Sequence, residues 1–180
     1  MTSQPATGIA ATEVQIPAPG SYRIEPAASS ITFATRHMFG LAAVNGSFAF
    51  ASGEITITEP DSTLQASAAI DASSFKTANA RRDKDVRSPK FLHVQAHPEI
   101  TFRSSRLGRD GDTWLLEGEL TVAGNAAPVA LRISSLVADA TGLSGQAAAR
   151  LDRYDHAITK MKGMAGRYLD LEITIRATRV

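Results

Sequence analysis

The sequence contains no cysteine among its 180 residues. This absence excludes disulfides, thiolate nucleophiles, iron–sulfur clusters and cysteine-based zinc sites, and it leaves the redox compartment undetermined. A Gly-x-Ser-x-Gly elbow and a glycine-rich phosphate loop are also missing. His93 and His97 are four residues apart, a spacing that would put both on one face of a helix and let them bind one metal ion. Pro98 disfavours helical geometry at His97. We therefore predict no metal site and no catalytic residue.

The chain also lacks net charge and long apolar runs. Lys and Arg number 19 against 18 Asp and Glu, a formal net charge of +1. So small a charge provides no long-range attraction to nucleic acids or anionic lipid surfaces, so we expect any partner to be held locally. The same charge argument predicts no nucleic-acid partner. No window approaches the roughly 20 apolar residues of a spanning helix, so we expect no stable membrane insertion.

The N-terminal 22 residues contain no Lys or Arg, and Pro and Gly interrupt every apolar stretch. No signal peptide is recognisable there, which favours a cytoplasmic location. We predict a disordered or loosely attached leader at residues 1–20. A single domain of ordinary size then occupies residues 21–180.

From Tyr22 onward, apolar and polar residues alternate with the period of two that is typical of strands with one buried face. Short turns rich in Gly, Pro, Asn and Asp separate the alternating segments. About eight to ten strands without βα units predict an antiparallel barrel or sandwich. The alternating segments are Ile31–Thr35, Val44–Phe50, Ile55–Ile57, Leu64–Ile70, Ile100–Ser104, Trp114–Val122, Val129–Val137, Leu143–Leu151 and Leu169–Ile175.

Alanines are abundant in and around these segments, whereas aromatic residues make up only 6% of the chain. Small inward-facing residues would leave space for one ligand inside a barrel of about eight strands. The alternative is that these alanines lie where packing is merely tight. They are Ala34, Ala43, Ala49, Ala66, Ala68, Ala69, Ala147, Ala148 and Ala149.

Residues 72–98 depart from the alternation and are polar. Asn79 is a candidate N-cap for a short helix through Val86, and Ser88 before Pro89 is typical of a second helical start. A connection of this length often carries function or covers an opening.

Several motifs follow one another in a fixed order: Tyr22–His37, Gly46–Phe48, Asp71–Phe91, His97–Ser104, Gly118–Gly124, Pro128–Val129 and the region of Arg153. In this order they resemble the YceI-like family from roughly Ser21 to the C-terminus. The resemblance implies an all-β fold, an extended antiparallel lipocalin-like β-barrel of about eight strands with a short helical insertion near residues 72–98. One departure is Arg153-Tyr-Asp-His-Ala157, where many members have Asp-Phe-Gly after the arginine.

The resemblance also implies that the apolar interior holds a long isoprenoid or other lipid-like chain, in a carrier, storage or stress-related protein. It implies no cofactor other than this bound isoprenoid or fatty chain, and it allows a homodimer. Family members are often periplasmic or secreted.

We expect apolar side chains to line the ligand and a few polar ones to meet its head group. The apolar candidates are Ile31, Phe33, Phe48, Ile70, Phe75, Phe91, Ile100, Phe102 and Trp114. His37, Asn79 and Arg82 are placed nearer the head group, and Asp83 is expected to help hold the insertion across the barrel mouth. A structural hydrogen bond for His37 and a solvated, salt-bridged helix for residues 81–87 are the alternatives.

Two other functions stay open. In the first, the protein is an enzyme on a lipid or quinone-like substrate, with His37 and either Asp83 or Tyr154 moving a proton. In the second, the barrel is filled with side chains and has an interaction role.

The glycine-containing segment 160–166 carries two methionines beside two lysines. It is typical either of a loop at the barrel rim, where soft Met side chains admit varied lipid chains, or of an ordinary turn between strands.

Overall fold

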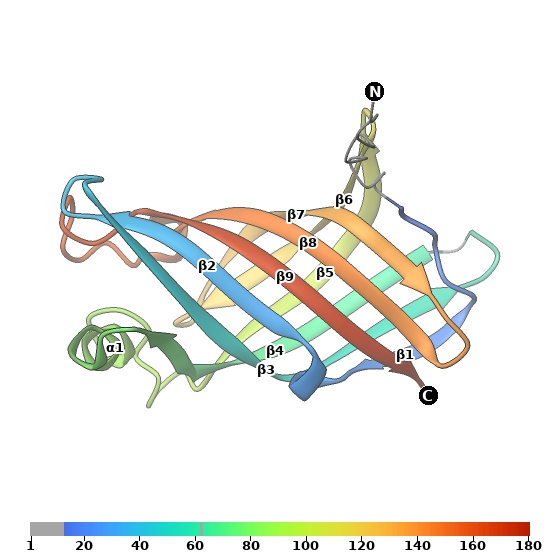
Figure 1. Cartoon of the computed structure of the whole chain (residues 1–180), viewed down its shortest axis with the longest axis horizontal. Coiled ribbons are helices and arrows are strands. Elements are labelled where there is room, and N and C mark those ends of the chain that lie inside the picture. The colour runs from blue at the N-terminus through green and yellow to red at the C-terminus, as the bar shows by residue number, and fades with distance from the viewer. Residues whose placement is uncertain (1–12, 62) are drawn as a thin grey trace, which may run out of the picture.

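The computed structural model describes residues 13–180 except residue 62, and most of these lie in strands (Figure 1). The helical elements are few: α1, Ala80–Arg87, and the 3-10 turns η1, Pro26–Ala28, and η2, Arg153–His156. In the described part of the chain, no helix has the length and apolarity needed to cross a bilayer. The strands are β1, Gly20–Ile24; β2, Ser30–His37; β3, Ala42–Thr58; β4, Thr63–Thr77; β5, Glu99–Asp110; β6, Thr113–Val122; β7, Asn125–Ala138; β8, Gly142–Asp152; and β9, Tyr168–Arg179.

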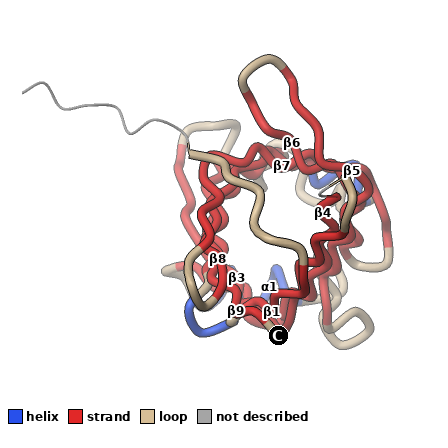
Figure 2. Tube along the Cα trace, turned by 90° about the vertical axis from the view of Figure 1, so that its right-hand side faces the viewer, coloured by secondary structure: helices blue, strands red, loops and turns tan. Residues whose placement is uncertain are grey.

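Strands β2 to β9 form a closed antiparallel barrel. Each pairs with the next along the chain, and β9 returns to pair with β2 through contacts such as Ile31 with Ile173. The short strand β1 pairs with both β3 and β9, and the view along the barrel shows the ring (Figure 2). The predicted barrel, with about eight strands and a short helix in the 72–98 insertion, is confirmed.

The predicted alternation places apolar residues inside, but bulges shift it at particular points. The pairing of β7 with β8 changes register between Ile133 and Ser135, so Leu136 is buried and Val137 is not. A second shift lies between Phe50 and Ser52 in β3, and it moves the inward face from Phe50 to Ile55. A bulge adds an unpaired residue and so exchanges the two faces of a strand.

The helical insertion begins later than predicted, because β4 continues to Thr77 instead of ending near residue 72. Asn79 caps α1 as predicted, with its side-chain oxygen accepting a hydrogen bond from the Arg82 backbone N–H at 3.0 Å. Ser88 does not start a second helix: it ends α1, and its backbone N–H donates to the Asp85 carbonyl at 3.1 Å. One short helix therefore lies at this end of the barrel, where Arg82 and Val86 line the interior.

At the opposite end, the segment before β1 contacts the barrel. The Gln15 N–H donates to the Leu136 carbonyl at 2.8 Å, and the Tyr22 hydroxyl donates to the Ala18 carbonyl at 2.6 Å. Figure 2 shows this segment crossing the barrel end. The predicted loose leader thus lies partly outside the described residues, at 1–12, while residues 13–19 are attached and not loose.

Close backbone approach explains the glycine at position 46. A Cβ built there would lie 2.3 Å from the Phe33 ring and 2.6 Å from the Lys76 carbonyl oxygen. Only a residue without a side chain lets β3 pass between them.

We predict that Gly46→Ala lowers the free energy of unfolding by about 2 kcal/mol, because the added methyl overpacks this site. The measurement is chemical denaturation followed by circular dichroism. Asn45→Ala, on the exposed face of the same strand, is the control and should change stability little. Equal stabilities of the two variants would contradict the packing argument.

Candidate ligand cavity inside the barrel

The barrel contains a cavity of about 320 Å³. Side chains from all eight barrel strands and from α1 line it, and most of them are aliphatic or aromatic. This volume falls within the roughly 300–1,000 Å³ typical of small-molecule sites. A barrel filled with its own side chains, one of the alternatives considered above, is therefore not what the structure shows.

Small residues create part of this space. Ala66 and Ala68 of β4 and Ala147 of β8 line the cavity, where longer side chains would fill it. These three are the inward-facing small residues that leave space, as expected, whereas Ala34 and Ala148 are exposed on the outer face and do not contribute.

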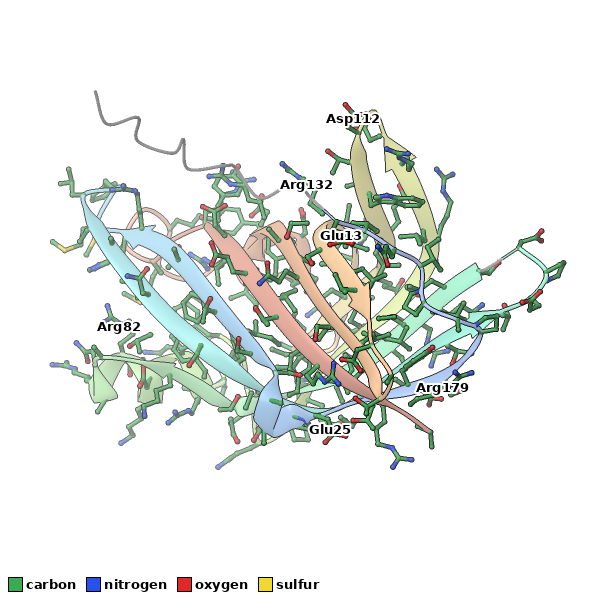
Figure 3. The ribbon with its side chains drawn as sticks, turned by 45° about the vertical axis from the view of Figure 1, so that its right-hand side comes forward. Glu13, Glu25, Arg82, Asp112, Arg132 and Arg179 are labelled. Carbon is green, nitrogen blue, oxygen red and sulfur yellow. The ribbon has the colours of Figure 1, made fainter. Side chains whose placement is uncertain are left out.

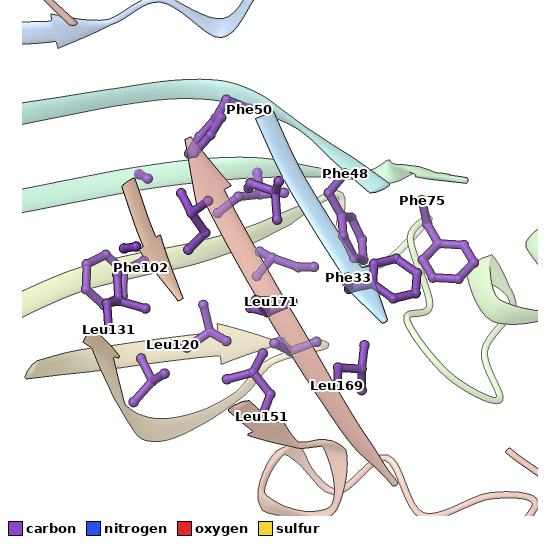
Figure 4. Close-up of a pocket in the computed structure, with 18 of the residues that line it drawn as sticks. Phe33, Phe48, Phe50, Phe75, Phe102, Leu120, Leu131, Leu151, Leu169 and Leu171 are labelled. Atoms are coloured by element: carbon purple, nitrogen blue, oxygen red, sulfur yellow. The ribbon is translucent and has the colours of Figure 1, made fainter. Parts of the chain in front are cut away.

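Three phenylalanines form an aromatic cluster in the cavity near α1. Phe33 of β2 stacks on Phe75 of β4 at 5.4 Å between ring centroids, and Phe48 of β3 meets the Phe75 ring edge-on at the same separation. Figure 4 shows them together, with leucines of β6 to β9 lining another part of the cavity. The cluster presents a rigid apolar wall to whatever occupies the cavity.

The charged or titratable groups that line the cavity are all basic. They are His37 at the end of β2, Arg82 on α1, and Arg153 and His156 of η2. Among the described residues, no carboxylate lines the cavity. The strand ends and turns that carry these four groups are on the α1 side of the barrel, where Figure 3 marks Arg82. The cavity therefore has one basic end.

Arg153 is buried, with 7% of its surface exposed. Its guanidinium donates to the carbonyl oxygens of Ile158 at 2.6 Å, Gly166 at 2.8 Å and Ala165 at 3.2 Å. Burial lowers the pKa of Arg153 from its ordinary value, yet an arginine side chain keeps its proton in proteins. A positive charge therefore persists beside the cavity, and it also fixes the loop that follows η2.

His156 is buried next to Arg153, with its Nδ1 2.9 Å from the Asn125 carbonyl oxygen. Because a carbonyl oxygen can only accept, Nδ1 carries the hydrogen. Arg153 and His156 were missing from the candidates proposed from the sequence. The signal was present in the departure from Asp-Phe-Gly at residues 153–157, which puts a titratable side chain at a position now seen to face the cavity.

Of the apolar candidates, all except Trp114 line the cavity: Ile31, Phe33, Phe48, Ile70, Phe75, Phe91, Ile100 and Phe102. Trp114 lies near the tip of the β5–β6 hairpin, beyond the last pairing of β5 with β4 at Arg103, while its own strand still pairs with β7 opposite Ile133. There its indole packs under the Arg109 guanidinium, 5.1 Å from the ring centroid. The alternation of β6 was correct, but it could not show that the cavity ends before Trp114, which packs against the core outside the cavity lining.

The polar candidates divide in the same way. His37 and Arg82 line the cavity, whereas Asn79 is occupied as the helix cap. Asp83 is buried away from the cavity, and its carboxylate accepts hydrogen bonds from the Thr77 N–H at 2.9 Å and the Thr77 hydroxyl at 2.7 Å. It fastens α1 to β4, so it holds the insertion in place without reaching a ligand.

The proton-moving pair considered for an enzyme is not assembled here. Asp83 is committed to Thr77, and Tyr154 lies outside the cavity lining with Arg167 over its ring at 4.5 Å. His37 therefore lines the cavity without either predicted partner.

Comparisons with known proteins agree with this architecture. A UPF0312 protein of Pectobacterium carotovorum subsp. carotovorum is 31% identical over 156 residues, covering 83% of this chain and 80% of that protein. The fold is similar to that of BcnA from Burkholderia cenocepacia, with a TM-score of 0.73, 16% identity and coverage of 84% of this chain and 98% of that one.

A second solved structure with this fold is described as a polyisoprenoid binding domain from Saccharophagus degradans. Its TM-score is 0.62 at 13% identity, and the match covers 88% of this chain and 98% of that one. Residues 22–178 match the YceI-like domain family. With nearly the whole barrel inside that match, the chain belongs to the YceI-like domain family.

Proposed function

We propose that the barrel binds one long apolar chain of the isoprenoid or fatty class. The observation that carries this proposal is the cavity of about 320 Å³ inside the barrel, lined by apolar side chains along the barrel and by basic groups at one end only. The polyisoprenoid binding domain of Saccharophagus degradans, which shares the fold, supports the same class of ligand.

Apolar burial alone gives enough energy for this binding. Each buried methylene contributes about 0.8 kcal/mol, so a chain that buries about ten of them gains about 8 kcal/mol before the costs of immobilising it. The aromatic cluster of Phe33, Phe48 and Phe75 and the leucines of β6 to β9 supply that contact surface. Few polar contacts are then required.

We propose that the ligand's head group lies at the basic end of the cavity. His37, Arg82 and Arg153 line the cavity there, and a carboxylate that would attract a cationic head is missing from the described lining. Guanidinium groups bind phosphate and other anionic oxygens through short, charge-assisted hydrogen bonds. We therefore propose a neutral polar or anionic head, phosphate being the best match.

The role that follows is carriage or storage of the ligand without chemical change. Arg153 and His156 are hydrogen-bonded to backbone carbonyls, and Asp83 is hydrogen-bonded to Thr77. We therefore assign these groups a structural role and no role in proton transfer. No cofactor is needed for such a role.

Filling the cavity should abolish ligand binding. Ala147 faces inward, and in Ala147→Phe the ring would occupy space that the chain requires. The protein, produced in its native cells and purified without detergent, is analysed by native mass spectrometry, followed by organic extraction of the bound material. We expect the wild type to carry a stoichiometric isoprenoid or fatty chain and Ala147→Phe to carry none.

Ala148→Phe is the matched control, since its side chain adds the same ring to the outer face of the same strand. It should retain the ligand. A wild-type protein that is folded and free of any lipid, or an Ala147→Phe variant that keeps full occupancy, would refute the proposed binding site.

Arg82 should select the head group. Loss of one charge-assisted hydrogen bond in Arg82→Ala should weaken binding of a prenyl phosphate by roughly tenfold, while binding of the prenyl alcohol of equal length changes little. Titration of both probes, followed by tryptophan fluorescence or calorimetry, gives the two affinities. Arg81→Ala is the control, because Arg81 is exposed on the same helix and does not line the cavity. An equal loss for both probes would show that Arg82 acts only through the structure.

A further inference from the structure

The α1 end of the barrel carries a group of exposed apolar side chains, here called the apolar tip: Met38, Phe39, Leu41, Met161 and Met164. Phe39 and Leu41 are 79% and 83% exposed, which is unusual for side chains of this size. They come from the loop between β2 and β3 and from the loop between η2 and β9. The apolar tip is therefore built from two segments more than a hundred residues apart in the sequence.

The two loops are held against each other by their backbones. The Met38 N–H donates to the Met164 carbonyl at 2.9 Å, and the Phe39 N–H donates to the Gly163 carbonyl at 2.6 Å. Met38 and Phe39 have positive φ angles of 52° and 57°, a conformation that bulky residues adopt rarely and at some energetic cost. The fold thus maintains an exposed phenylalanine in a defined position and does not turn it into the core.

Charge is divided between the two ends of the barrel. The connections at the α1 end, residues 38–41, 78–98, 123–124 and 153–167, contain nine basic and three acidic residues. The connections at the other end, residues 25–29, 59–62, 111–112 and 139–141, contain five acidic residues and no basic one. Figure 3 places Arg82 away from Glu25 and Asp112. The connections at the two ends therefore differ in charge, although Asp139 and Asp112 at the second end are paired with Arg176 and Arg109 of the adjoining strands.

We propose that the α1 end docks on a lipid bilayer surface that carries anionic headgroups. The apolar tip enters the boundary between headgroups and acyl chains, and Lys160 and Lys162, which flank Met161, lie against the lipid phosphates. A second copy of the chain fits this end less well, since a two-fold contact would bring its basic connections against each other.

The docking surface is continuous with the cavity. Ala165 and Gly166, which directly follow Met164, line the cavity, as does His37, which directly precedes Met38. A chain extracted from the bilayer would therefore enter beside the apolar tip, with its head left among the basic groups. This transfer step rests on the proposed function, whereas docking itself does not.

The test is co-sedimentation of the full chain with vesicles of phosphatidylcholine, with and without phosphatidylglycerol. We expect binding to the anionic vesicles, weakened at least tenfold in the double variant Phe39→Ser with Leu41→Ser. Replacing a lysine near the membrane surface costs roughly fivefold in binding, so Lys160→Glu with Lys162→Glu should lose at least tenfold as well. High salt should weaken binding of the wild type.

Matched controls come from the opposite end. Ile16→Ser with Val180→Ser removes two exposed apolar side chains there, and Arg106→Glu with Arg109→Glu reverses two exposed charges. Both should bind vesicles as the wild type does, with unchanged circular dichroism spectra in all variants. Equal weakening in the controls, or no wild-type binding to anionic vesicles, would overturn the proposal.

Two further outcomes separate this proposal from its alternatives. Ala147→Phe should still bind vesicles, because the probe vesicles contain no isoprenoid and docking does not need an open cavity. Docking can therefore be true even if the proposed ligand is wrong. If Phe39→Ser with Leu41→Ser instead converts a dimer to a monomer in sedimentation velocity and leaves vesicle binding intact, the apolar tip is an interface between copies and the proposal fails.

Discussion

Closure of the sheet is the constraint on which the rest of this structure depends. Once β9 pairs with both β8 and β2, the ring has a fixed circumference, and its interior can neither collapse nor widen to suit its contents. Whether that interior is solid or hollow is then decided by side-chain size alone. Ala66, Ala68 and Ala147 at inward positions leave the cavity open, in a core that otherwise consists of ordinary Ile, Leu and Phe side chains.

The strands and the barrel could be predicted from the sequence because alternation is a local property that each strand carries in its own residues. The burial of a residue that depends on how its strand pairs with a neighbouring strand could not be predicted in this way. Val137 follows the alternation of β7, yet a bulge against β8 buries Leu136 in its place. Trp114 is on the inward face of its strand, yet β5 stops pairing with β4 at Arg103, and Trp114 lies beyond the end of the cavity, under the Arg109 guanidinium. In each case the register or length of the partner strand decides whether the side chain is buried or lines the cavity. The residues of the strand itself do not determine that register.

The same limitation applies to charge and to the polar candidates. In a barrel whose strands run up and down, successive connections go to opposite ends, so charges that alternate along the sequence become separated in space. The net charge is the sum over both ends, so the opposite charges of their connections cancel in it. Asp83 shows the corresponding limit for single residues: its place in the insertion was predicted, but only the structure shows that Thr77 occupies its carboxylate.

The burial of the charged Arg153 side chain beside the cavity has an energetic cost that bears on the proposed ligand. A buried cation ordinarily has a carboxylate partner, because desolvation is costly and attraction to an anion offsets it. Within the described residues, Arg153 forms no direct ion pair, and carbonyl oxygens of the loop after η2 supply its hydrogen bonds. The carboxylate of Asp152 attracts it from a longer distance, while binding Arg167 directly. Packing alone does not require a charge here, since an apolar side chain could fill the same volume. An anionic or strongly polar head group of the kind proposed above would add a second counter-charge to that of Asp152, at the end of the barrel where Lys160 and Lys162 also lie.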